Sequence, residues 1–329
     1  MATTSPTDLR GAQGRANRAR LASVLQQQGA LIALALLLLF GGLRYDGFLS
    51  AYNMAEALRY NAMFGLIALG MTFVIMTGGI DLSVGSLVAL ASVVTALLSP
   101  YGLLPALVGP VLVGTLAGLI SGTVIARLGI APFITTLALM LAARGLALML
   151  APSSVVVAAE SGVTVIGQNN LGWLPLPAVV LAAAYLVGSV VLNRTRFGRH
   201  VLAVGGGEDA ARLMGLPVAR INVAVYALSG GLAGLAGVLL AAQTGTGVPT
   251  VAVGWELQAI AAVVVGGTLL TGGRGSVGTT LVGVLLLGLI INVLSFEGLS
   301  PYWQSVIRGG FLLIVVMLQN QLTRRDRTS

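Results

Sequence analysis

Apolar runs of roughly 20 residues recur along this chain between residues 24 and 322, separated by short polar or glycine-rich stretches. Each run has about the length that an α-helix needs to cross the hydrocarbon core of a bilayer, whereas strands of a membrane β-barrel alternate over about 10 residues. The pattern predicts an all-α fold, a polytopic transmembrane helical bundle of about ten spans. We expect these spans at residues 24–43, 61–77, 82–98, 103–126, 131–151, 175–192, 223–242, 257–271, 276–296 and 305–322.

Composition agrees with a membrane protein and excludes several functions. Charged residues are 9% of the chain and hydrophobic residues 57%, whereas a soluble domain has about 25% charged residues. There is no cysteine, so disulfides, thiol nucleophiles and thiolate metal sites are excluded. All 18 basic residues are arginine, and a Walker A loop needs a lysine to reach the nucleotide phosphates. Any ATP that drives this protein must therefore be hydrolysed on a partner.

The arginines predict the orientation, because cytoplasmic loops carry an excess of basic residues. With the N-terminus inside, ten spans place fourteen arginines in the cytoplasm and only Arg44 and Arg59 outside, while Arg144 and Arg308 fall within spans. We expect an Arg-rich cytoplasmic tail at 1–23, not a cleaved signal peptide. A transmembrane domain at 24–322 and a cytoplasmic tail at 323–329 complete the predicted organisation.

One polar island interrupts the apolar pattern at residues 193–222, with the sequence NRTRFGRHVLAVGGGEDAARLMGLPVARIN. It is too long for a turn and too short for a catalytic domain, so it predicts a docking surface for another protein. Glu208 and Asp209 favour the first turn of a short helix, Gly215 favours its end and Pro217 blocks its continuation. Small and apolar contact surface would come from Ala211, Leu213 and Met214. The alternative is a solvated amphipathic loop.

Two glycine-rich interruptions, TGGIDLSVGS at 77–86 and VGGTLLTGGRGSVGT at 265–279, divide apolar sequence. Irregular backbone at membrane depth persists only where protein or a water-filled cavity satisfies its polar groups, so these stretches predict broken helices. Their similarity suggests an internal repeat, and transporters often place their pathway at such an interface. Two Gly-rich cytoplasmic turns are the alternative, and the two interpretations are compatible.

Three motifs carry a resemblance to a known family: GMTFVIMTGGIDLSVGS at 70–86, TRFGRHVLAVGGGEDAARLMGL at 195–216 and ELQAIAAVVVGGTLLTGGRGSVGTTLVG at 256–283. Together they resemble the sugar ABC transporter permeases of the ribose, xylose, arabinose and galactofuranose group, and among these a galactofuranose-type permease. The resemblance covers about residues 60–322.

The resemblance implies the permease subunit of an ATP-driven monosaccharide importer in the bacterial inner membrane, with a fold similar to the vitamin-B12-type (type II) importers. It implies a cytoplasmic ABC ATPase subunit, a periplasmic or extracellular sugar-binding protein and a second permease copy or paralogue as partners, in contact with membrane lipid. It also implies that short helices in the 193–222 loop sit in a groove of the ATPase. The coupling residues expected there are Gly198, Glu208, Ala211, Arg212 and Gly215.

Asp81 is the acidic residue of the first interruption, and two roles remain open for it. A carboxylate in a membrane protein is a functional candidate by default and would accept hydrogen bonds from a sugar, but an Asp before LSVGS also suits a helix cap. The residues expected to line or gate the translocation path are Asn61, Thr77, Gly78, Gly79, Asp81, Ser83, Gly85 and Asn292. For Asn61 and Asn292 the alternative is hydrogen bonding between helices.

No catalytic, metal or cofactor site and no nucleic-acid partner is expected. The single histidine, His200, lacks ligands at metal spacing, and no GxSG or GxGD string marks a membrane hydrolase. The functional alternative is an ion-coupled secondary transporter of a small polar solute, which needs a buried acid for its cation. Asp81 is the one candidate for that acid.

Overall fold

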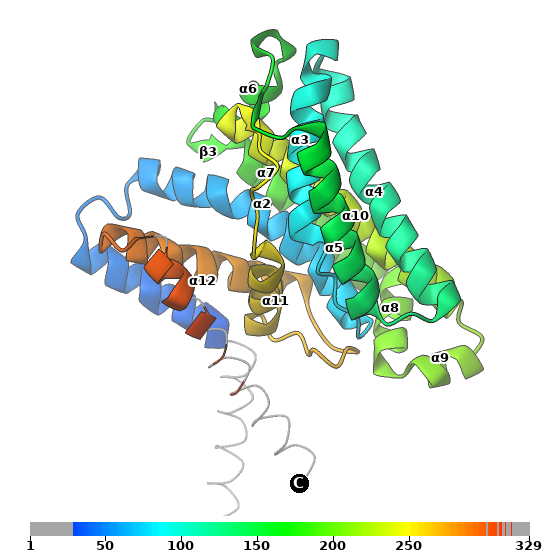
Figure 1. The fold of residues 1–329 in the computed structure, drawn as a ribbon. Helices are drawn as coiled ribbons and strands as arrows, with labels where there is room; N and C mark the ends of the chain where they lie inside the picture. Colours follow the sequence, from blue (N-terminus) through cyan, green and yellow to red (C-terminus); the bar gives the residue numbers. More distant parts are fainter. Residues whose placement is uncertain (1–28, 301, 308, 311–312, 314–316, 318–329) are drawn as a thin grey trace, which may run out of the picture.

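The protein is a helical membrane bundle in the computed structural model, which describes residues 29–300, 302–307, 309–310, 313 and 317. Figure 1 shows helices throughout, with four two-residue strands in two small antiparallel pairs, β1–β4 and β2–β3. The long helices are α2 (Ala51–Met76), α3 (Val84–Leu98), α4 (Leu103–Leu128), α5 (Pro132–Leu150), α7 (Leu176–Arg194), α10 (Val218–Thr244) and α12 (Val277–Phe296). The shorter helices are Gly29–Arg44, α6 (Val163–Gln168), α8 (Arg196–Gly206), α9 (Glu208–Leu213) and α11 (Trp255–Val265), with 3₁₀ turns at Ser99–Tyr101 and Ala159–Ser161. The strands are β1 (Val155–Val156), β2 (Asn170–Leu171), β3 (Leu174–Pro175) and β4 (Thr246–Gly247).

Within the described residues, seven of the ten predicted spans coincide with helices that are long and apolar enough to cross a membrane. One of them, α3, reaches this length together with the 3₁₀ turn that follows it. The eighth prediction, 257–271, is wrong: α11 has 11 residues and is about 16 Å long, too short for a core of about 30 Å. Helix formation stops at Val265 because Gly266 and Gly267 follow. The predictions for 1–23 and 323–329 lie outside the described residues, as does most of 305–322.

Two helix starts differ from the sequence prediction. Helix α2 begins ten residues early, at Ala51, where the Ser50 side chain accepts a hydrogen bond from the Asn53 amide. Its first turns carry Glu56 and Arg59, which interrupt the apolar pattern, but Arg59 is buried and bonded rather than in a loop. Helix α10 begins at Val218 rather than 223, so the polar island is shorter than predicted.

Helices α4 and α10 cross at close range through glycines. A Cβ on Gly114 would overlap the carbonyl oxygen of Gly230, and one on Gly230 would overlap that of Gly114. Gly118 meets the Tyr226 carbonyl oxygen in the same way. Gly114 and Gly118 are four residues apart in the sequence and so share one face of a helix, a spacing that predicts close helix packing, and this packing is confirmed. Helix α10 contacts α4, α3 and α2 at the centre of the bundle.

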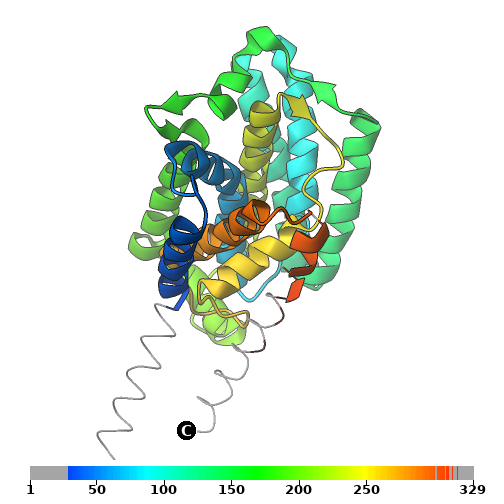
Figure 2. The same cartoon turned by 90° about the vertical axis from the view of Figure 1, so that its left-hand side faces the viewer.

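The two ends of the bundle differ in structure. One end holds α6 and the small strand pairs, where Val155 pairs with Gly247 and Asn170 with Pro175. The other end holds α8 and α9 together with the connections at 77–83 and 266–276. Figure 1 shows α6 and α9 at opposite extremes of the molecule, and the turned view of Figure 2 agrees. We refer to them as the α6 end and the α9 end.

Candidate translocation and coupling site

The polar island forms two helices, α8 and α9, which we call the coupling module (residues 196–213). Helix α8 starts directly after α7, and the Thr195 side chain caps it by accepting a hydrogen bond from the Gly198 amide at 3.3 Å. Gly198 lies so close to α7 that a Cβ there would overlap the Leu192 carbonyl oxygen. Gly198, one of the predicted coupling residues, therefore allows the chain to fold back sharply where the module begins.

Helix α9 is the short capped helix predicted from the sequence. Glu208 lies in its first turn and pairs with Arg212 at 2.5 Å, one turn later. Gly215 has φ +77°, and the Leu216 amide donates to the Ala211 carbonyl at 3.0 Å, which is the pattern of a Schellman end. Gly215 therefore ends α9 where expected, and Pro217 is the N-cap residue of the next helix, α10.

The outer surface of α9 differs from the prediction in one residue. Leu213 is 90% exposed, more than any other large apolar side chain among the described residues, and Met214 is 68% exposed. Ala211, predicted to face a partner, is instead buried against the bundle with no exposed surface. Because residues two apart lie on nearly opposite faces of a helix, burial of Ala211 leaves Leu213 to point outward.

Three glycine-rich connections meet at the α9 end, and we call their contact the glycine joint (Met76, Gly78, Gly205, Gly272 and Gly273). The Gly273 amide donates to the Met76 carbonyl oxygen at 3.0 Å. A Cβ on Gly205 would overlap that same oxygen, and one on Gly272 would lie 2.9 Å from the Gly78 amide nitrogen. Both predicted interruptions and the end of α8 are therefore in direct backbone contact, with no side chain between them.

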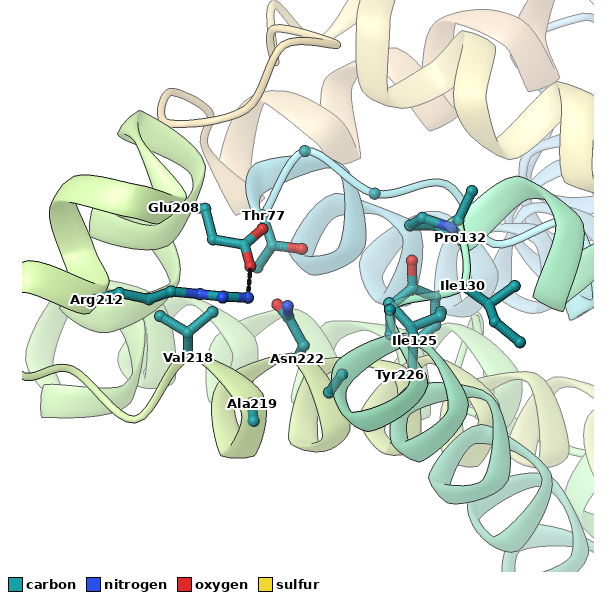
Figure 3. A pocket seen from close by; sticks show the side chains of 15 residues that line it. Thr77, Ile125, Ile130, Pro132, Glu208, Arg212, Val218, Ala219, Asn222 and Tyr226 are labelled. Carbon is teal, nitrogen blue, oxygen red and sulfur yellow. Dashed lines mark hydrogen bonds and ion pairs between the residues drawn. The ribbon is translucent and has the colours of Figure 1, made fainter.

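Beside this joint lies a pocket of about 380 Å³, drawn in Figure 3. It brings together residues from the two predicted sets: Thr77, Gly78 and Gly79 from the path set, and Glu208 and Arg212 from the coupling set. The rest of the wall is formed by Ile125, Ala126, Gly129, Ile130, Ala131, Pro132, Val218, Ala219, Asn222 and Tyr226. The ion pair of α9 thus faces the same space as the end of α2.

Tyr226 and Asn222 in this pocket were not predicted as site residues. Tyr226 is 1% exposed, and its hydroxyl has no hydrogen-bond partner among the described residues and lies against Gly79. Asn222 stands one helical turn before it on α10 and lines the same space. The sequence held a signal for Asn222, which closes the polar island, but Tyr226 is hidden in an apolar run.

Asp81 does not line this pocket. It is 1% exposed, and one carboxylate oxygen accepts hydrogen bonds from the Ser83 amide at 3.0 Å and the Ser83 hydroxyl at 2.6 Å. The other oxygen accepts from the Ser229 hydroxyl on α10 at 2.8 Å. Every bond ties the turn before α3 to itself or to α10, in the manner of an Asx turn; the N-cap residue of α3 is Ser83.

The remaining path candidates are spread over other contacts. Asn61 is buried against Gly288 of α12 and donates to the Ala57 carbonyl at 2.7 Å. Asn292 exchanges hydrogen bonds with Asn53 at 2.9 and 3.1 Å. Asn292 therefore hydrogen-bonds α12 to α2, as in the alternative for it. The hydrogen bond of Asn61 stays within α2, and its contact with α12 is one of packing against Gly288. Gly85 lies in the first turn of α3, against Glu256.

The chain matches a family model over residues 53–316, and that family is described as the permease component of the branched-chain amino acid transport system. The matched range covers most of the chain. The chain belongs to this permease family. It is a multi-pass membrane component of a transport system, and permeases of this kind are non-catalytic subunits.

Curated relatives cover nearly the whole permease. The ribose import permease RbsC of Bacillus subtilis is 39% identical over 94% of this chain and 97% of its own length. The L-arabinose transport system permease AraH of Escherichia coli is 36% identical over 93% of this chain and 94% of its own. The inner membrane ABC transporter permease YjfF of Escherichia coli is 39% identical over 85% and 87%. No solved structure matches the permease.

Proposed function

We propose that this permease is the membrane-spanning subunit of an ATP-driven monosaccharide importer in the bacterial inner membrane. The observation that carries the proposal is the 39% identity to a ribose import permease across 94% of the chain. An L-arabinose permease matches almost as well over a similar length, which favours a sugar over the amino acids in the family's description. The finer similarity to a galactofuranose-type permease stays a prediction.

Three protein partners follow from this function. A cytoplasmic ABC ATPase supplies the energy, since a chain without lysine has no Walker A loop of its own. A sugar-binding protein delivers the substrate at the α6 end. A second permease copy or paralogue completes the pathway within the lipid. The predicted orientation, with the N- and C-termini and the coupling module in the cytoplasm, puts the α9 end where the ATPase is.

The surface of α9 supports its assignment as the ATPase contact. Leu213 and Met214 project from a short helix whose other face is packed on the bundle. Exposed large apolar side chains at a defined point are typical of a protein interface. Glu208 and Arg212 stiffen the helix through their ion pair, and Gly215 forms its C-terminal end. Gly198 lies at the start of α8, where it lets the coupling module fold back against α7.

Force applied to α9 reaches the spans through the glycine joint. Because Gly205, Met76 and Gly273 touch through their backbones, displacement of α8 displaces the end of α2 and the connection before α12. Such a rigid-body movement is a common route for a switching transition. We assign the pocket at Thr77–Gly79 as the cytoplasmic mouth of the route, which opens and closes as α9 moves.

Within the permease domain (24–322), the other predicted path residues support this movement rather than contact the pocket. Asp81 and Ser83 hold the turn that precedes α3, Asn292 bonds α12 to α2, and Asn61 packs against Gly288 of α12. Gly85 leaves room for Glu256. We propose that they shape the wall of the route, which is consistent with irregular backbone that borders a cavity.

The test is ATPase stimulation in the assembled transporter. The permease is purified with the ATPase and the sugar-binding protein encoded beside it, reconstituted in lipid, and given D-ribose, L-arabinose, D-xylose, galactofuranose or L-leucine. We expect one sugar to stimulate ATP hydrolysis at least severalfold and leucine to have no effect. Stimulation by leucine alone, or failure of the permease to bind any ABC ATPase, would contradict the proposal.

A further inference from the structure

The connection between α10 and α11, residues 245–254, runs through the bundle without forming a helix, and we call it the gate segment. After β4 pairs with β1 at the α6 end, the chain turns inward along α3. The Val248 amide donates to the Ser92 hydroxyl at 3.2 Å. Seven residues nearer the start of α3, a Cβ on Gly85 would lie 2.5 Å from the Ala252 carbonyl oxygen. Figure 1 shows this chain descending from the α6 end to the start of α11.

Non-helical backbone inside a membrane protein needs partners for its polar groups. Arg144 of α5 supplies them: its guanidinium donates to the carbonyl oxygens of Pro249 at 2.6 Å and Val251 at 2.8 Å. Arg144 is the thirteenth of the 19 residues of α5, so the contact lies within the length of the span. A charged residue there is costly unless it is paired, and its pairing is with the gate segment.

The gate segment is also strained. Ala252 has φ +58° and is the one described residue other than glycine with a positive φ. Such a conformation is unfavourable for a residue with a side chain and persists only where surrounding contacts impose it. Two residues later Gly254, with φ +80°, ends the segment and starts α11. The strained stretch at residues 249–252 is held by the Arg144 side chain, and the segment is held further back by Ser92 of α3. Strain in such a stretch favours a second conformation once the hold of Arg144 is lost.

Open space lies beside the gate segment. A groove of about 310 Å³ is lined by Val253, Gly254, Leu257 and Gln258 on one side and by Leu287 and Ile291 of α12 on the other. A displacement of residues 249–254 toward this groove would separate the gate segment from α3 and α5. The groove thus provides room for movement in the direction away from Arg144.

We propose that the gate segment closes the translocation route on the side of the α6 end, and that Arg144 is the positioning residue that latches it shut. This inference rests on the proposed function, since it assigns the outer gate of that importer. Arg144 acts on the gate segment and has no contact with sugar in this role. When the latch opens, the carbonyl oxygens of Pro249 and Val251 become acceptors for sugar hydroxyls.

The test measures passive leakage of sugar. Proteoliposomes that hold the permease with its ATPase are loaded with radiolabelled D-ribose and L-arabinose, and efflux is followed without ATP or binding protein. Arg144→Met removes every donor while it keeps a long apolar side chain, and we expect efflux to rise at least tenfold. Arg144→Lys keeps the charge but loses the planar fork, so an intermediate rise is expected.

Arg59 provides a matched control. It is also an arginine of a long helix; it is buried, whereas Arg144 is half-buried, and it donates to the Gly167 carbonyl at 2.6 Å and to Asn170 at 2.8 Å. These contacts hold the α6 region and leave the gate segment untouched. Arg59→Met is expected to lower the yield of folded protein without raising efflux.

Two outcomes would overturn the latch. One is efflux from the Arg144→Met protein no faster than from the wild type, and the other is equal leakage from Arg59→Met, which would indicate general loosening. Failure of the proposed function has a different signature, because wild-type protein with ATPase, binding protein and ATP would then take up no sugar. If the wild type imports sugar and the Arg144→Met variant does not leak, the latch is refuted while the proposed function stands.

Discussion

Two non-helical stretches, the turn at 77–83 and the gate segment at 245–254, are stabilised in different ways. The turn at 77–83 holds itself, because Asp81 bonds Ser83 two residues away and fastens the turn to α10 through Ser229. The gate segment at 245–254 depends on one arginine of α5 and on Ser92 of α3. A self-bonded turn moves as a rigid unit with the helix it starts, whereas a segment held from outside can be released. The first suits force transmission and the second suits a gate.

The largest effect on sugar uptake is expected at Gly205, where the coupling module meets the end of α2 and the turn at 77–83. Gly205→Ala puts a methyl group onto the Met76 carbonyl oxygen, so the backbones of α8 and α2 must separate. We expect sugar uptake to fall at least tenfold while ATPase binding is retained, because Leu213 and Met214 are unchanged. Uptake in proteoliposomes and co-purification with the ATPase measure the two effects.

The neighbouring glycine is the control for this variant. Gly206 has nothing within 4 Å of the position of a Cβ, so Gly206→Ala should transport like the wild type. Equal losses for the two alanine variants would show that the glycine joint transmits nothing specific.

A smaller loss is expected at the end of α9. Gly215 has φ +77°, and proline is fixed near −65°, so Gly215→Pro breaks the end of the helix. Sugar-stimulated ATPase activity should fall severalfold while the protein still reaches the membrane. Gly215→Asn is the matched variant, because asparagine tolerates the left-handed region; it should retain most of the stimulation. A Pro variant as active as the Asn variant would remove α9 from the coupling route.

Asp81→Asn tests whether the hydrogen bonds of Asp81 stabilise the turn at 77–83 rather than contact the sugar. The amide still accepts from Ser83 but loses the charge-assisted bonds, a cost of about 1–3 kcal/mol. We expect a lower yield of folded complex and normalised uptake within about twofold of the wild type. Uptake per assembled complex that falls tenfold with a normal yield would instead make Asp81 a residue of the pathway, or the cation site of the alternative transporter.

The smallest effect is expected at Ala252. Ala252→Gly removes the strain of the positive φ at the centre of the gate segment, which amounts to about 1 kcal/mol. The closed form should become slightly more favourable, so we expect up to a few-fold slower uptake and no increase in passive efflux. Faster efflux from this variant would show that the strain keeps the gate shut rather than helping to open it.

The sequence was a good guide to features that depend on local pattern. Apolar length located seven long helices, and the glycine, acidic and proline residues of 205–217 located α9. The four-residue spacing of Gly114 and Gly118 predicted a close helix contact, although it did not reveal that α10 is the partner.

Features that depend on tertiary contacts were hidden. Arg59 and Glu56 looked like loop residues because the partners that bury Arg59, Gly167 and Asn170, are more than a hundred residues away. Apolar residues at 257–271 resembled a span, yet only 255–265 is helical, and the gate segment before it has no local sequence signal. The pairing of Arg144 with two carbonyl oxygens is equally invisible to pattern, since any backbone offers such acceptors.

The claim that ATP hydrolysed on a partner subunit drives sugar import is tested most directly by leaving out one component of the transporter at a time. The permease, the ATPase and the sugar-binding protein are reconstituted in proteoliposomes, and uptake of the stimulating sugar is measured with each component left out in turn. We predict that uptake needs all three proteins and ATP, and that it persists when proton and sodium gradients are collapsed. Uptake by the permease alone, abolished by collapse of an ion gradient, would contradict ATP-driven import and favour the ion-coupled alternative.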